Sequence, residues 1–119
     1  INNIQFIHGT SEQVFESTLL KCKGNLNIFL DGHYSEGETF QGDVDTPLDL
    51  ELDSIIRNRS RFENITLFVD DVRCMNPNTT EFSDYPSILG IVAKLDPFVD
   101  RYLIEHDILI AFFKKNLVN

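Results

Sequence analysis

The apolar residues of this 119-residue chain occur in short runs, some with the spacing of strands and some with the spacing of helices. The longest runs, residues 88–93 and 108–113, are six residues each, whereas a membrane-spanning helix needs about twenty apolar residues. The pattern therefore predicts no membrane segment. A chain of this length suffices for one compact core, so residues 1–119 are expected to form a single domain.

The order of these runs predicts the fold class. Strands are expected at residues 4–8, 26–30 and 65–69, and a C-terminal hairpin at residues 102–105 and 108–113. Helices are expected to follow the capping-box pair Thr10 and Gln13, the pair Thr46-Pro47, and Ser87. This alternation predicts an α/β, Rossmann-like fold: a mainly parallel sheet of about five strands, with helices on both faces and a C-terminal antiparallel hairpin.

The net charge of -9 argues against nucleic acid or an anionic membrane as a partner. The charge is concentrated in residues 31–53, which contain eight acidic residues and no basic one. Four of the eight are explained by a predicted helix start, where the helix dipole favours carboxylates: Asp45, Asp49, Glu51 and Asp53.

The two cysteines, Cys22 and Cys74, are 52 positions apart and have no neighbouring cysteine. We interpret them as packed free thiols in a reducing compartment, which predicts a cytoplasmic protein. The first residues lack an initiator methionine and the features of a signal peptide, so the sequence is expected to begin partway through a longer chain.

Acidic residues follow two of the predicted strands directly. Asp31 follows the strand at 26–30, and the pair Asp70-Asp71 follows the strand at 65–69. Ligands of parallel sheets bind at the carboxyl ends of the strands, and crowded carboxylates favour a hard divalent cation such as Mg²⁺. His33, two residues beyond Asp31, is a candidate for proton transfer near neutral pH. The alternative is that these residues only cap turns.

Three segments together resemble class I S-adenosylmethionine-dependent methyltransferases, in particular cation-dependent O-methyltransferases of the catechol and macrocin types. They are Ile7-His8-Gly9-Thr10-Ser11-Glu12, Ile28-Phe29-Leu30-Asp31-Gly32-His33-Tyr34 and Leu67-Phe68-Val69-Asp70-Asp71-Val72. They are similar to the ends of the family's third, fourth and fifth strands, and the terminal hairpin is similar to its last two strands.

The resemblance implies a role for each matching residue. Asp31, Asp70 and Asp71 would bind Mg²⁺, and His33 would act on a hydroxyl group of a small-molecule substrate. Ser11 and Glu12 would contact the adenine of S-adenosylmethionine. The family's first strand with its glycine-rich loop, and its second strand, have no counterpart here, so the resemblance implies part of an O-methyltransferase.

Two further hypotheses belong to other classes. The missing glycine-rich loop favours a non-catalytic remnant that self-associates into a homo-oligomer through an exposed sheet edge. The same three carboxylates are also compatible with metal-dependent phosphoryl transfer, although no phosphate-binding loop is present.

Overall fold

The computed structural model describes residues 3–31, 48–75 and 87–115. Its helices are α1 (Ser11–Leu19), α2 (Leu48–Asn58) and α3 (Ile88–Leu95). Its strands are β1 (Gly24–Leu30), β2 (Phe62–Val69), β3 (Val99–Glu105) and β4 (Ile108–Phe113). Short 3-10 helices are η1 (Arg59–Arg61), η2 (Val72–Met75) and η4 (Asp96–Phe98). The predicted α/β class and the C-terminal hairpin are confirmed.

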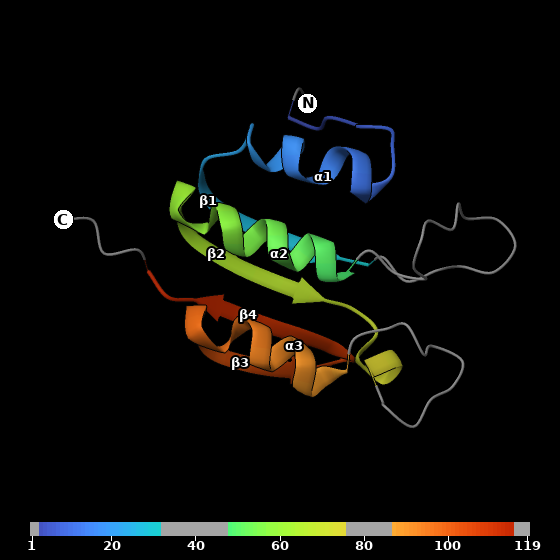
Figure 1. Cartoon of the computed structure of the whole chain (residues 1–119), viewed down its shortest axis with the longest axis vertical. Coiled ribbons are helices and arrows are strands. Elements are labelled where there is room, and N and C mark those ends of the chain that lie inside the picture. The colour runs from blue at the N-terminus through green and yellow to red at the C-terminus, as the bar shows by residue number, and fades with distance from the viewer. Residues whose placement is uncertain (1–2, 32–47, 76–86, 116–119) are drawn as a thin grey trace, which may run out of the picture.

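The four strands form one mixed sheet in the order β1-β2-β4-β3 (Figure 1). β1 and β2 are parallel, whereas β4 runs antiparallel to both β2 and β3. The prediction of a mainly parallel sheet of about five strands is therefore wrong for the described residues. The expected strand at residues 4–8 does not form, and its Ile4 and Phe6 are 71% and 94% exposed. The alternating residues there have no neighbouring strand to pair with, so periodicity alone did not make a strand.

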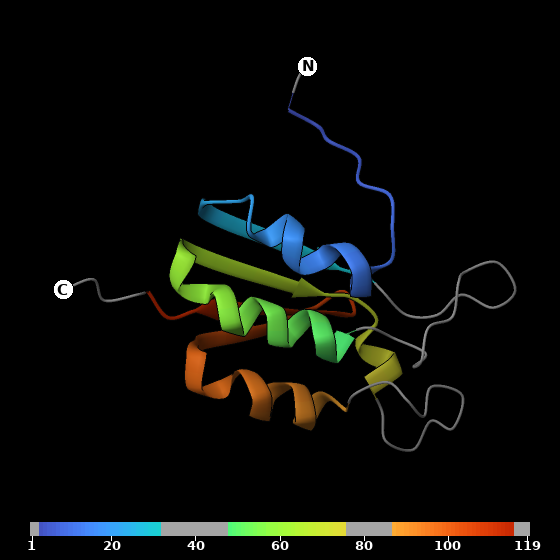
Figure 2. The same cartoon turned by 45° about the horizontal axis from the view of Figure 1, so that its top comes forward.

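All three helices lie on the same face of the sheet, as the two views agree (Figures 1 and 2). The strand residues that face them are buried, for example Leu30, Leu67 and Leu109. On the opposite face Phe29 is half exposed, and its ring stacks on that of Phe68 with 6.3 Å between centroids. The prediction of helices on both faces is therefore also wrong for the part of the chain that the structure describes.

The helix starts that lie within the described residues follow their sequence signals. The backbone N–H of Thr10 donates to Gln13 Oε1 at 3.4 Å, as a capping box requires. The hydroxyl of Ser87 accepts from the backbone N–H of Gly90 at 3.0 Å. The predicted start at Thr46-Pro47 lies outside the described residues, and α2 is described from Leu48.

The β3–β4 hairpin closes through His106 and Asp107, both of which have left-handed backbone angles, φ 53° and 66°. Two successive left-handed residues are the geometry of a tight hairpin turn, and aspartate tolerates it better than most residues do. The turn also contacts the rest of the fold, because the backbone N–H of Val72 donates to the carbonyl of Asp107 at 3.0 Å. The hairpin tip is thereby fixed beside η2.

Neither cysteine forms a disulfide, as predicted: Cys74 is buried and Cys22 is partly buried. Within the described residues, no helix combines the length and the apolar character needed to cross a bilayer.

Candidate metal centre and an adjacent pocket

Parallel pairing of β1 and β2 brings the first two predicted aspartates to one edge of the sheet. Leu30 is paired with Val69, and the next residue of each strand is Asp31 or Asp70. The backbone N–H of Asp70 donates to the carbonyl of Leu30 at 3.0 Å, so the ladder continues to the point where the carboxylates begin. The topology, rather than any local motif, places these two side chains together.

Asp71 reaches the same place because the chain turns sharply after Asp70. Its φ of 68° is left-handed, a conformation that aspartate tolerates by bonding locally. Its backbone N–H donates to Asp70 Oδ1 at 2.8 Å, and its carbonyl accepts from the N–H of Cys74 at 2.8 Å as η2 begins. Asp71 is only 4% exposed, whereas Asp31 is exposed and Asp70 is intermediate.

One carboxylate oxygen from each of Asp31, Asp70 and Asp71 lies within 4.8 Å of the other two. We call this cluster the acidic triad. Oxygens on opposite sides of a cation are about 4.2 Å apart around Mg²⁺ and about 4.8 Å apart around Ca²⁺, twice the usual metal–oxygen distances. Three oxygens that all lie within 4.8 Å of one another are therefore spaced as the ligands of one divalent cation require. Three hard oxygen donors are a suitable ligand set for either ion.

Arg73 lies against the triad and was not predicted to take part. Its guanidinium is 2.9 Å from Asp71 Oδ1 and also pairs with the carboxylate of Asp107 in the hairpin turn. The backbone N–H of Arg73 donates to Asp107 Oδ1 at 2.9 Å. The hydrogen bond that Arg73 donates to Asp107, followed by the charge of Asp71, raises the pKa of Arg73 above its ordinary value. Because 34 residues separate Arg73 from Asp107, the sequence carried no signal for this contact.

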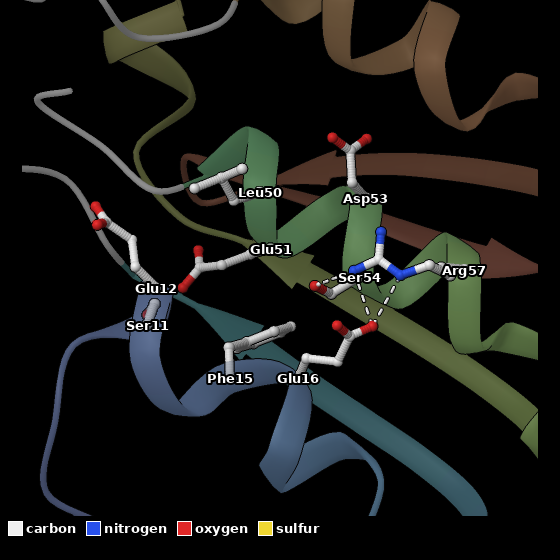
Figure 3. A pocket seen from close by; sticks show the side chains of 9 residues that line it. All are labelled: Ser11, Glu12, Phe15, Glu16, Leu50, Glu51, Asp53, Ser54 and Arg57. Atoms are coloured by element: carbon white, nitrogen blue, oxygen red, sulfur yellow. Dashed lines mark hydrogen bonds and ion pairs between the residues drawn. The ribbon is translucent and has the colours of Figure 1, made fainter. Parts of the chain in front are cut away.

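The predicted cofactor residues Ser11 and Glu12 belong to a different feature. They line a cavity of about 230 Å³ between α1 and α2 (Figure 3). We call it the interhelix pocket. Both helices begin at the edge of the sheet toward which β1 and β2 point (Figure 1). The start of the pocket and the acidic triad therefore lie on the same side of the molecule but on different elements.

Glu51, which projects into the pocket, was predicted to serve only the start of α2. It is instead 5% exposed. Burial raises the pKa of its carboxyl group, and a hydrogen bond with Ser11 offsets part of that effect. A signal was available: residues 48, 51, 52 and 55 follow helical spacing, which places Glu51 on the buried stripe with three apolar residues.

Asp49 and Asp53 also lie near the start of α2, and each has a partner on another helix. Lys94 Nζ on α3 is 3.2 Å from Asp49 Oδ1 and 2.8 Å from Asp53 Oδ1. Desolvation lowers the pKa of Lys94, but its hydrogen bonds to Asp53 and then Asp49 outweigh it and raise the pKa overall. These two acids therefore connect α2 to α3, in addition to lying at a favourable helix end.

His33, the predicted proton acceptor, lies outside the described residues, and so does Asp45. Their predicted roles stay predictions. Comparison of the chain with protein-family models, with curated proteins and with solved structures found no match. The fold and the two acidic features are therefore the observations on which a function can be argued.

Proposed function

We propose that this chain is a methyltransferase-like domain, part of a cation-dependent O-methyltransferase that uses S-adenosylmethionine. The observation that carries the proposal is the acidic triad at the carboxyl ends of β1 and β2, with oxygens within 4.8 Å of one another. Ligand sites of open α/β sheets occur at this edge. The three residues are also the ones that the sequence resemblance assigns to the metal.

The strand order supports the same proposal. The last strand, β4, is antiparallel and lies between β2 and β3, so β3 is parallel to β1 and β2. The final strand of class I methyltransferases is likewise the reversed strand and is inserted beside the one before it. All three helices lie on one face, which leaves the other face for elements of the half of that fold that has no counterpart here (Figure 2).

Each residue has a task in this proposal. The acidic triad would hold Mg²⁺ or a similar divalent cation, which when bound supplies a positive charge that orients a substrate hydroxyl group and stabilises its deprotonated form. His33 would accept the hydroxyl proton, while Ser11 and Glu12 would contact the adenine. Arg73 fixes the orientation of Asp71. Positioning contributes most to the rate, because the cofactor already carries the methyl group on a good leaving group.

Calorimetric titration with Mg²⁺ and with S-adenosylmethionine tests the proposal. We expect Mg²⁺ binding that is weakened at least about tenfold in Asp70→Ala, because one of three charged ligands is lost. Asp100→Ala, an exposed aspartate on β3, is the matched control and should bind as the unaltered chain does. The proposal fails if the chain binds neither ligand, or if Asp70→Ala leaves binding unchanged.

A second candidate, a non-catalytic self-associating domain, is favoured by one observation. The sheet face without helices carries apolar side chains from three neighbouring strands: Phe29, Phe68 and Ile110. Leu103 of β3, paired with Ile110, extends this outer sheet face and is 45% exposed. Contiguous apolar patches on a surface are typical of interfaces.

Sedimentation velocity separates the two candidates. If the outer sheet face mediates self-association, Phe29→Lys should shift the protein to the monomer. Leu89→Lys, which places the same charge on the helical side at a residue that is 78% exposed, should leave the oligomer intact. A chain that is monomeric at all concentrations and still binds Mg²⁺ would exclude the self-association role.

A further inference from the structure

The interhelix pocket contains a carboxylate oxygen that the fold leaves without a hydrogen-bond partner. Glu51 projects from the first turn of α2 toward α1, where Ser11 bonds to it (Figure 3). Its other oxygen, Oε1, is buried and accepts no hydrogen bond in the structure. A buried acceptor that lacks a donor destabilises the folded chain. Such a cost indicates that something outside the described chain donates to this atom.

The walls of the pocket define what would fit beside that oxygen. Phe15 of α1 and Leu50 of α2 provide apolar surface. The cavity of about 230 Å³ has room for roughly eight water molecules, or a ligand with about that number of heavy atoms. The occupant is therefore a small ring or short chain, rather than a peptide or a polysaccharide.

The charges around the pocket are mostly negative. Glu12 and Glu16 of α1 and Glu51 and Asp53 of α2 line it, and Arg57 is its basic residue. Arg57 pairs with Glu16 within the pocket, since its guanidinium lies 2.8 Å from Glu16 Oε2, so these two residues together add no net charge. Asp53 is likewise paired with Lys94 of α3. The field that remains favours a positively charged group beside Glu51.

We propose that the interhelix pocket binds a small organic cation of the amine or amidine class, whose N–H groups donate to the carboxylate of Glu51 and whose apolar body contacts Phe15 and Leu50. The donor nitrogen completes the hydrogen bonding of Glu51, and its charge compensates the carboxylates around the pocket. Ser11 holds Glu51 in the orientation that faces the ligand. Although Ser11 and Glu12 are also the predicted adenine contacts, this site is defined by Glu51 and does not require methyl transfer.

The ionisation of Glu51 couples binding to pH. A cation binds the ionised carboxylate more tightly than the neutral acid, and burial raises the pKa of Glu51 from its ordinary value of 4.5. Affinity should therefore increase with pH as Glu51 loses its proton. The other charged groups at the pocket are Glu12, Glu16, Asp53 and Arg57, and the variant Glu51→Gln separates the contribution of Glu51 from theirs.

Benzamidine is a suitable probe because it joins an amidinium group to one flat ring. Titration of the 119-residue chain, followed by NMR of backbone amides, should give a dissociation constant of roughly 1 mM. The largest shifts should fall on α1 and on the first turns of α2. Benzamide, which has the same shape without the charge, should bind roughly tenfold to a hundredfold more weakly. Guanidinium carries the charge but lacks the ring, so the difference between its affinity and that of benzamidine measures the contribution of the apolar walls.

Glu51→Gln assigns the effect to this residue, because it keeps the size and a hydrogen-bonding oxygen but removes the charge. It should weaken benzamidine binding roughly tenfold or more and abolish its pH dependence. Glu63→Gln, at an exposed position on β2, is the matched control and should bind normally.

The proposal is overturned if benzamidine does not bind at about ten times that concentration, if benzamide binds equally well, or if the shifts lie elsewhere. The benzamide comparison uses the unaltered chain, so it decides the matter even if Glu51→Gln fails to fold. Absence of S-adenosylmethionine binding would refute the methyltransferase proposal and leave this one standing.

Discussion

Two sets of carboxylates lie on the same side of the molecule, and the surroundings of their members differ. In the acidic triad Asp31 and Asp70 follow neighbouring strands and are partly open to solvent, and Asp71 is buried. In the interhelix pocket Glu51 faces inward between α1 and α2 and is 5% exposed. In the acidic triad, charges converge because parallel strands end together. In the interhelix pocket, a charge is buried because helical spacing places it on an apolar stripe. A carboxylate at a strand end can therefore bind a hydrated cation, whereas a carboxylate on the buried stripe of a helix can bind only a cation that has lost its water.

The largest expected effect tests whether α2 docks in the way that buries Glu51. Leu52, the next residue, is fully buried, and Leu52→Ala should lower the free energy of unfolding by about 2–5 kcal/mol through lost contacts and a cavity. Leu50 is 53% exposed, so Leu50→Ala should cost less than about 0.5 kcal/mol. Urea unfolding of both variants measures the difference. Equal losses would mean that α2 is rotated relative to the structure described.

The next effect concerns the acidic triad. Arg73→Met removes the guanidinium that pairs with buried Asp71, so we expect a loss of stability smaller than that of Leu52→Ala. If the triad binds divalent cations, Mg²⁺ should restore part of this loss by supplying the missing positive charge. Arg101→Met, which removes a guanidinium stacked on Phe112, is the control. Its acidic triad is intact, so Mg²⁺ should stabilise it only as much as it stabilises the unaltered chain. Thermal unfolding with and without Mg²⁺ gives both results. If Mg²⁺ raised the unfolding temperature of both variants by the same amount, Arg73 would not be coupled to a cation site at the acidic triad.

Glu51→Gln should have a smaller effect, and its sign depends on pH. The folded-state pKa of Glu51 is raised, so the native chain binds more protons than the unfolded chain does above about pH 4.5, and its stability falls as pH rises through that pKa. The variant lacks this loss. It should be more stable than the unaltered chain by about 1 kcal/mol at neutral pH, with no gain at pH below about 4. Denaturant unfolding of both proteins across this pH range measures the difference in their free energies of unfolding. A difference that did not change with pH would contradict the burial of Glu51.

Glu16, which lines the same pocket, should show the opposite pH dependence and the smallest effect. Hydrogen bonds from Asn58 and Arg57 lower the pKa of its carboxyl group. A lowered pKa contributes stability above the ordinary value of 4.5, and that contribution is lost as pH falls through the folded-state pKa. Glu16→Gln should therefore be slightly less stable than the unaltered chain at neutral pH and equal to it in acid. If the stability difference of Glu16→Gln changed with pH in the same direction as that of Glu51→Gln, the contrast between these two carboxylates would be contradicted.

The sequence was sufficient where local signals and topology agree. The capping residues Thr10 and Ser87, the strands that precede Asp31 and Asp70, and the terminal hairpin all carry short-range signals, and the structure has them as predicted. The acidic triad followed from one further rule, that parallel strands end at a common edge.

The sequence failed where the outcome depends on distant partners. Residues 4–8 alternate as a strand does, but no described strand pairs with them. The single-sided helix layer and the link between Arg73 and Asp107 are likewise set by tertiary packing, which periodicity does not encode. Glu51 was missed for another reason: its helical spacing was available, but its charge suggested an exposed position.

Titration with Mn²⁺, a paramagnetic substitute for Mg²⁺, tests the central claim most directly, because it maps the cation onto individual residues. We predict that the amide signals of Asp31, Asp70 and Asp71 broaden first, that Mg²⁺ reverses the broadening, and that Asp70→Asn removes it while Asp53→Asn does not. Broadening that is spread evenly over the acidic surface, or that persists in Asp70→Asn, would contradict a cation site at the ends of β1 and β2.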